Sequence, residues 1–354
     1  MHEKNGREGE YMNNIITFDE KISTYSFYTN VIGRFYEIYK SGEKSIPILD
    51  FRNTKYIFPT AAPLLLSFGD YLKRLYKKSV PILYEKGSEV HNFFIFSKFY
   101  EISNKLEIFD WGEDVLNEWN YKELRDLHKI SYTYTSYSDA DKIKDPMQRR
   151  DFIFDCLLDK SKVVYENILK DSNQLPEDIV SATIHAIAEI ETNAIMYSGS
   201  YSFTFVASNR YGTSISVADS GIGFERSFLT KERKMKMLEK FQYVGGKFHN
   251  YLVIMSALNY SFEKHLEDKR ADLWTLRTNV INNNGTFKIQ YENTQVIFSC
   301  NRCRGCRKNK DRADISTCVQ CLLDKYSMDA YSPIKIFNIG FQGVRIEITI
   351  NKEK

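Results

Sequence analysis

The chain of 354 residues is 43% hydrophobic and 27% charged, a composition typical of globular proteins that excludes wholesale disorder. Its formal net charge of +3 at pH 7 excludes a strong overall field that would draw it to nucleic acid or an acidic membrane. The opening residues are polar and no run of about 18 apolar residues is present, so we expect a cytoplasmic protein with no membrane partner.

The first hundred residues show alternating strand and helix patterns. Residues 46–51 and 80–84 are short apolar runs typical of buried strands. Between them, residues 61–76 carry leucines and a phenylalanine at helical spacing. A strand, a crossover helix and a second strand predict a small sheet covered by helices.

This stretch resembles a STAS domain, the fold of anti-sigma-factor antagonists. The resemblance is carried by the strand Ile48-Leu49-Asp50-Phe51, the turn Phe58-Pro59-Thr60-Ala61-Ala62 and the helix after it. We place the STAS-like domain at residues 1–98, ordered from about residue 12. In that family the turn carries a phosphorylatable Ser or Thr followed by Gly, which makes Thr60 a candidate phosphorylation site, with Ala61 in the Gly position. The alternative is that Thr60 caps the helix.

Residues 99–172 are polar and mainly helical in pattern, most clearly from Asp151 to Leu169. Within them, Tyr132 to Ser138 is a β-prone or loop stretch. We predict that residues 99–172 form a helical connector to a second domain at residues 173–350.

The second domain opens with a strong helix pattern, from Pro176 to about Ala194. His185, Glu189 and Asn193 recur every four residues and therefore share one helix face, which could simply face solvent. Two β-prone runs follow, from Tyr201 to Ala218, and they predict a hairpin.

The hairpin ends in Asp219-Ser220-Gly221-Ile222-Gly223. A carboxylate at a strand end, followed by two glycines, suits close approach of the backbone to a ligand. Together, Glu189-x-x-x-Asn193-Ala194 and Asp219-x-Gly221-x-Gly223 resemble the N box and first glycine box of the GHKL ATP-binding fold. That fold occurs in gyrase-type ATPases, chaperones, histidine kinases and anti-sigma-factor kinases.

The resemblance implies a Bergerat α/β sandwich that binds ATP with Mg²⁺. It implies that Asn193 coordinates Mg²⁺, that Asp219 accepts a hydrogen bond from the adenine amino group and that Gly221 and Gly223 line the nucleotide. It makes Glu189 the general base. A histidine kinase is not expected, because no helix pair with a phosphoacceptor His precedes the domain, and His185 is interpreted as structural.

The second glycine box of the family has its closest alignment at Arg270-Ala271-Asp272-Leu273, where Ala271 and Asp272 replace glycines. An aspartate beside a triphosphate is electrostatically unfavourable. The resemblance therefore predicts nucleotide binding. Two functions stay open: a slow ATPase or protein Ser/Thr kinase that switches a protein partner, and a non-catalytic nucleotide-sensing scaffold.

The remaining strands are expected near the end of the chain. Residues 286–290 and 295–298 predict a hairpin around Glu292 and Asn293. Residues 344–350 alternate strictly between polar and apolar side chains, which predicts a half-buried strand.

Five of the six cysteines lie between residues 300 and 321, in a predicted insertion at residues 300–333. Cys303, Cys306, Cys318 and Cys321 form two C-x-x-C pairs with the spacing of a structural zinc site, and Cys300 could replace one ligand. An iron–sulfur cluster is the alternative. Residues 302–312 are strongly basic and could contact nucleic acid or an acidic partner, although a solvated loop is the more common case.

Overall fold

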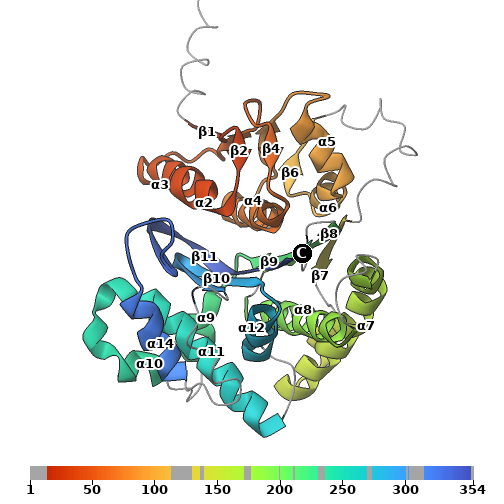
Figure 1. The fold of residues 1–354 in the computed structure, drawn as a ribbon. Helices are drawn as coiled ribbons and strands as arrows, with labels where there is room; N and C mark the ends of the chain where they lie inside the picture. Colours follow the sequence, from red (N-terminus) through yellow and green to blue (C-terminus); the bar gives the residue numbers. More distant parts are fainter. Residues whose placement is uncertain are drawn as a thin grey trace, which may run out of the picture.

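The computed structural model describes residues 14–112, 130–135, 139–170, 177–198, 200–209, 212–229, 236–268, 273–299, 302 and 315–351. These residues form two α/β units, each built on its own β-sheet (Figure 1). The predicted mixed α/β class is confirmed at this level. No helix in the described part of the chain is long and apolar enough to cross a membrane.

The first unit contains a parallel sheet. Its strands, in spatial order, are β1 (Ile15–Thr17), β3 (Ile48–Asp50), β5 (Val80–Leu83) and β6 (Phe109–Asp110). Its longer helices are α3 (Ile32–Lys40), α4 (Ala62–Tyr76), α5 (Glu89–Phe96) and α6 (Phe99–Lys105). Shorter elements connect them: β2 (Lys21–Ile22), α2 (Thr24–Ser26), the π-helix η2 (Phe27–Val31), β4 (Tyr56–Ile57) and the 3-10 helix η3 (Pro59–Ala61). The predicted strand–helix–strand is thus present as β3, α4 and β5.

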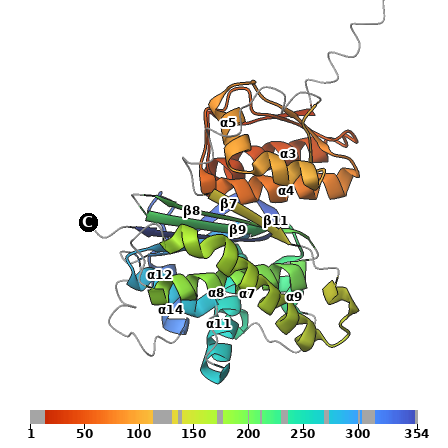
Figure 2. The same ribbon diagram turned by 90° about the vertical axis from the view of Figure 1, so that its right-hand side faces the viewer.

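The second unit contains an antiparallel sheet. Its strands, in spatial order, are β10 (Thr286–Ser299), β11 (Ile334–Asn351), β9 (Gly212–Asp219), β8 (Ser202–Asn209) and β7 (Ile130–Thr135). Its helices are α7 (Pro146–Lys170), α8 (Glu177–Ser198), α9 (Gly223–Leu229), α10 (Lys236–Lys240), α11 (His249–Asp268), α12 (Leu273–Asn282) and α14 (Ile315–Asp324). Short 3-10 turns lie at η4 (Asp139–Lys142), η5 (Gln242–Val244) and η6 (Gly246–Phe248). The helices gather on one face of this sheet (Figure 2).

Residues 99–172, predicted as a connector, are instead divided between the two sheets. Strand β6 pairs with β5 and completes the first sheet. Strand β7 pairs with β8 along its whole length, and α7 packs against α8. The first unit therefore extends beyond residue 98 to at least residue 110. Strands as short as β6 carry too few residues for a periodicity to indicate them.

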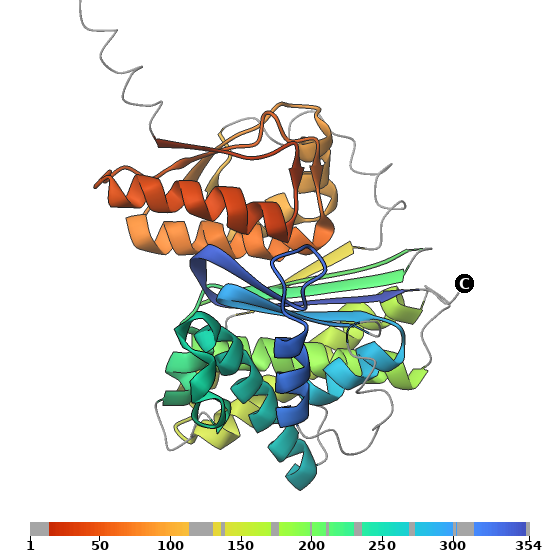
Figure 3. The same cartoon turned by 60° about the vertical axis from the view of Figure 1, so that its left-hand side comes forward.

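The first unit covers the sheet face opposite the helices of the second unit. Helices α3 and α4 lie side by side directly above this face (Figure 3). Helix α4 contacts β8 and β9, and α3 contacts β11. The antiparallel sheet is therefore buried on both sides.

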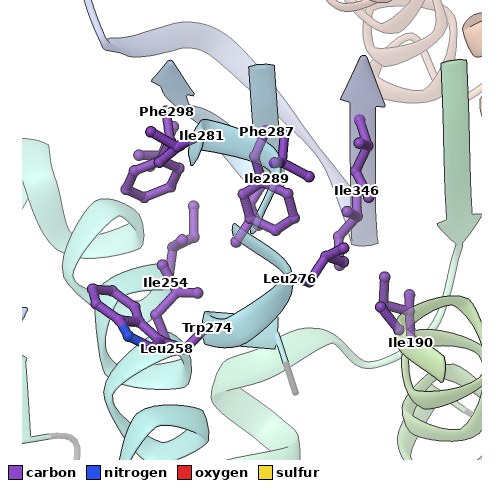
Figure 4. Packing of buried hydrophobic residues seen from close by; sticks show 14 of the residues in the cluster. Ile190, Ile254, Leu258, Trp274, Leu276, Ile281, Phe287, Ile289, Phe298 and Ile346 are labelled. Atoms are coloured by element: carbon purple, nitrogen blue, oxygen red, sulfur yellow. The ribbon is translucent and has the colours of Figure 1, made fainter. Parts of the chain in front are cut away.

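Two large hydrophobic cores correspond to these layers. One lies between the second sheet and its helices, and Figure 4 shows Ile254, Leu258 and Trp274 of the helices facing Phe287 and Ile289 of β10. The other fills the first unit and continues into the second sheet, because it includes four phenylalanines of β8 and β11: Phe203, Phe205, Phe337 and Phe341. The two units therefore share a core.

Two predictions about the last strands are wrong. Residues 286–298 do not form a hairpin: β10 is one strand that pairs with β11 throughout, with irregular register around Glu292, whose φ is 49°. Residues 344–350 are not half-buried either, because Arg345 and Glu347 on the outer face are covered by the first unit. An isolated strand pattern does not reveal such long-range packing.

Candidate functional site

Helix α8 carries Glu189 and Asn193 on the side away from the sheet. Ile184 and Ile187 of this helix belong to the core beneath the sheet. Glu189 lies about 200° further round the helix than Ile187, at 100° per residue. The Nδ2 atom of Asn193 donates a hydrogen bond to Oε1 of Glu189 over 3.2 Å, and both residues are half-buried. The two predicted site residues are thus in contact, and the Asn193 amide oxygen is not used by this bond.

Arg150 of α7 is a partner of Glu189 that no sequence motif indicated. Its Nη2 atom donates to Oε1 of Glu189, and the two side chains are 9% and 16% exposed. A guanidinium at this position fixes the orientation of the carboxyl group. Nearby, His185 is half-buried with its ring 6.2 Å from that of Phe154 on α7, a packing position consistent with a structural role.

Asp219 ends strand β9 on the helix-covered face of the sheet. Ile215 and Val217 lie in the core below the sheet, and alternation along the strand places Asp219 on the same face. Its Oδ1 atom accepts a hydrogen bond from the backbone N–H of Gly221 over 2.8 Å. Burial raises the pKa of Asp219 to about 7, although the hydrogen bond from Gly221 acts in the opposite direction. The structure thus provides a buried carboxyl group that is already oriented by its own loop.

Close packing fixes the loop that follows Asp219. Gly223 has a φ of +73°, and a Cβ atom there would collide with the Tyr291 ring. Gly343 of β11 has a φ of +96°, and a Cβ atom there would collide with the carbonyl oxygen of Asp219. Glycine is required at both positions because the left-handed conformation and the close approach each disfavour a side chain.

Glu191 is a second buried carboxyl group, on the opposite side of α8 from Glu189. It is 1% exposed, and its Oε1 atom accepts a hydrogen bond from the hydroxyl of Thr204 on β8. Burial raises its pKa to about 7, and Lys160 of α7 opposes this shift. Sequence reasoning missed it, although its place four residues after Ile187, on the apolar side of the helix, was a usable signal.

Thr60 lies at the contact between the two units. Its hydroxyl donates to Oε1 of Glu347 on β11 over 3.4 Å, and its carbonyl accepts from Nη2 of Arg345 over 2.7 Å. No side-chain cap is formed at the start of η3 or of α4. The helix-cap alternative for Thr60 is therefore wrong, and its candidate role in phosphorylation stays a prediction.

Several predicted site residues lie outside the described residues: Ala271 and Asp272 of the second glycine box, and Cys300, Cys303 and Cys306 of the insertion. Helix α12, which begins at Leu273, packs against α8 and α11. Within the described ranges, no group of three or more His, Cys, Asp or Glu side chains could hold a metal ion. This finding does not include Cys300, Cys303 and Cys306.

The remaining two cysteines of the predicted metal site lie on α14. Cys318 is buried, and Cys321 is half-buried one helical turn further on. The Sγ atom of Cys318 accepts a contact from Nη2 of Arg277 at 3.6 Å. Arg277 is itself buried, and its guanidinium lies over the rings of Trp274 and Phe298. The two thiols thus lie one turn apart on the same helix, and the Cys318 sulfur has a polar partner in an otherwise apolar core.

The residues around α8 and the end of β9 combine hydrogen-bond acceptors with a constrained glycine loop. The Asp219 carboxyl is suited to accept a hydrogen bond from a donor group, and the Asn193 amide oxygen is suited to a hard cation. Comparison of the chain with family models, curated proteins and solved structures finds no match.

Proposed function

We propose that this protein binds ATP with Mg²⁺ in a GHKL-type site formed by α8, the loop at residues 219–223 and α12, and that nucleotide binding regulates a protein partner. The observation that carries the proposal is the state of Asp219: it is buried, on the helix side of the sheet, and oriented by the Gly221 N–H. A buried carboxyl with one oxygen held in this way suits recognition of the adenine amino group.

The arrangement of the other motif residues supports the same site. Asn193 uses its amide nitrogen to hold Glu189, which leaves its oxygen as the atom suited to Mg²⁺. Bound Mg²⁺ would neutralise phosphate charge. Helix α12 packs beside α8, where the second glycine box of the family would begin its helix. The STAS-like first unit is part of this proposal as a regulatory domain.

Glu189 is the proposed general base of a slow ATPase or a protein Ser/Thr kinase. A base must accept a proton from water or from a hydroxyl group within hydrogen-bond reach. Here the ion pair with Arg150 occupies Oε1. Catalysis through Glu189 therefore needs its Oε2 atom or a rearrangement of the pair. That observation favours the second candidate function, a nucleotide-sensing scaffold without turnover.

Nucleotide binding is tested by Asp219→Asn. Above its pKa of about 7 Asp219 is a charged acceptor, which Asn replaces with a donor or a neutral acceptor. Losing a hydrogen bond of this kind costs about 1.5–3 kcal/mol, or about ten- to a hundredfold in affinity. Calorimetry with ATP and Mg²⁺ measures the effect. Asp110→Asn is the matched control, because Asp110 also ends a strand and accepts from the N–H two residues on, at Gly112. Equal affinity of both variants would remove the basis for the site.

Turnover is tested by Glu189→Gln, which retains an acceptor for Arg150 and Asn193. If Glu189 is the base, the variant keeps nucleotide affinity and loses about 10²–10⁴-fold in rate. Glu177→Gln, at the exposed start of the same helix, is the control. Phosphate release and phosphate transfer are both measured, with the partner present. A rate equal to that of the wild type would show that Glu189 is not the base, and no turnover in either protein would make the protein a scaffold.

We also propose that Cys303, Cys306, Cys318 and Cys321 bind one structural zinc ion. The support is the position of Cys318 and Cys321 on one face of α14 and the cation of Arg277 beside Cys318. The iron–sulfur alternative would use the same thiolates. Contact between the basic residues 302–312 and nucleic acid has no support from the described residues, and the proposed partner is a protein.

A further inference from the structure

Helix α4 of the first unit makes direct hydrogen bonds to the proposed nucleotide loop. The Nη2 atom of Arg74 donates to the carbonyl oxygen of Ser220 over 3.1 Å and to its Oγ over 2.6 Å. The Nε atom of Arg74 donates to Oδ2 of Asp70, one turn earlier, over 3.0 Å. The hydroxyl of Ser220 in turn donates to the same Asp70 oxygen over 3.4 Å. The three side chains form a closed ring across the contact between the units.

The backbone of Ser220 also makes hydrogen bonds within the second unit. Its N–H donates to Oγ of Ser200, and its carbonyl also accepts from Nε2 of Gln342 over 2.6 Å. Ser220 is fully buried and Asp70 is 3% exposed. Burial raises the pKa of Asp70, and Arg74 opposes that shift, so the pair depends on both members. Removing Arg74 would leave the Asp70 carboxyl buried without the guanidinium and Oγ of Ser220 without its donor, whereas the Ser220 carbonyl would keep the bond from Gln342.

Ser220 lies between the two residues that define the proposed adenine acceptor. The Asp219 carboxyl precedes it, and the Gly221 N–H that orients this carboxyl follows it. A rotation of the Ser220 backbone would therefore move both members of the Asp219–Gly221 bond. Arg74 also acts through space, because its positive charge lowers the pKa of Asp219 and opposes the effect of burial.

We propose that Arg74 is a positioning residue for nucleotide binding: by holding Ser220 from the first unit, it keeps the loop at residues 219–223 in the shape that recognises the nucleotide. This inference rests on the proposed function. It gives the first unit a regulatory role, since nucleotide affinity then depends on the docking of α4. By linkage, bound nucleotide also strengthens that docking to the same degree.

The test compares Arg74→Met with Lys73→Met. Lys73 is the neighbouring cation on α4, but it bonds within its own unit, to the Leu106 carbonyl over 2.7 Å. Two quantities are measured in each full-length variant: the affinity for ATP and Mg²⁺ by calorimetry, and amide hydrogen exchange of the 219–223 segment without ligand. We expect Arg74→Met to weaken binding about tenfold and to speed exchange of this segment. Lys73→Met should change neither.

Ser220→Ala tests the ring from the second unit and covers the case in which Arg74→Met does not fold. It keeps the backbone carbonyl but removes the hydroxyl that contacts Arg74 and Asp70. We expect faster exchange of the segment and a smaller loss of affinity. If Arg74→Met and Ser220→Ala both match Lys73→Met in affinity and exchange, the inference is overturned while the nucleotide site stands. If the wild type binds no nucleotide, the proposed function itself is wrong.

Discussion

Glu189, Glu191 and Asp219 are three carboxyl groups of the second unit that differ in their partners and burial. Glu189 is paired with Arg150, whereas burial raises the pKa values of Glu191 and Asp219 to about 7. A carboxyl group buried in an apolar layer binds its proton more tightly than one in water. Their different surroundings suit different roles: an oriented hydrogen-bond acceptor at Glu189 and groups that titrate near neutral pH at the other two.

Glu191 should make the stability of the protein depend on pH. Its pKa is about 7 in the folded chain, against 4.5 for an ordinary Glu, so the folded state binds the extra proton between these values. The free energy of unfolding therefore falls as the pH rises from about 4.5 to about 7. Glu191→Gln removes this contribution to the pH dependence. We expect the variant to be more stable than the wild type at pH 8 by up to about 3 kcal/mol.

Urea unfolding at pH 5 and pH 8 measures the effect of Glu191→Gln. The exposed Glu177→Gln on the same helix should leave the pH dependence unchanged. Two results would show that Glu191 is ionised at neutral pH. One is a wild-type free energy of unfolding that does not fall between these pH values, and the other is a Glu191→Gln variant whose free energy of unfolding falls as steeply as that of the wild type.

The sequence motifs predicted Glu189, Asn193 and Asp219 as site residues, and the structure shows Glu189 and Asn193 in contact. They did not identify Arg150 or Arg74. Arg150 lies 39 positions from Glu189, and Arg74 lies 146 positions from Ser220. Such pairs depend on how α7 and α4 dock, which local patterns along the chain do not encode.

At the scale of elements, local periodicity predicted α4, α8, β8 and β9 to within a few residues of their observed bounds. The strands β10 and β11 were harder to predict, because a bulge near Glu292 interrupts the alternating pattern within one long strand. A break in alternation indicates a turn and a bulge equally well. Only the pairing partner, far along the chain, distinguishes the two.

Helix α14 provides the test of the zinc proposal. Cys318→Ser or Cys321→Ser should each remove a ligand and reduce the zinc content from one per chain to well below one. Because zinc binding and folding are coupled, protease should also cleave both variants faster within residues 300–333. Cys156→Ser on α7 is the control and should keep the metal. Iron with sulfide in the wild type would favour the cluster instead, and no metal at all would contradict both.

At the scale of the whole molecule, the docking of the first unit on the second sheet was not predicted. A signal for it was present in β8, where Phe203 and Phe205 alternate with Thr204 and Val206. All four side chains are buried. Apolar side chains on both faces of the strand, Phe203 and Phe205 on one and Val206 on the other, need cover on both faces. The helices of the second unit cover one face of the sheet, so the other face had to be covered by another part of the chain.

The shared core predicts that the two units unfold together. Phe341 of β11 lies within 5.7 Å of Phe68 and 5.5 Å of Tyr71, between ring centroids, and both partners belong to α4. Phe341→Ala should therefore cost about 3–5 kcal/mol and lower one common transition. Phe287→Ala, in the core between the second sheet and its helices, should lower the same transition, although Phe287 belongs to a different cluster. Calorimetry, with hydrogen exchange of peptides from both units, measures this. Two separate unfolding transitions, only one of which Phe287→Ala shifts, would contradict this prediction. They would show that the units fold independently and that α4 docks on an already folded sheet.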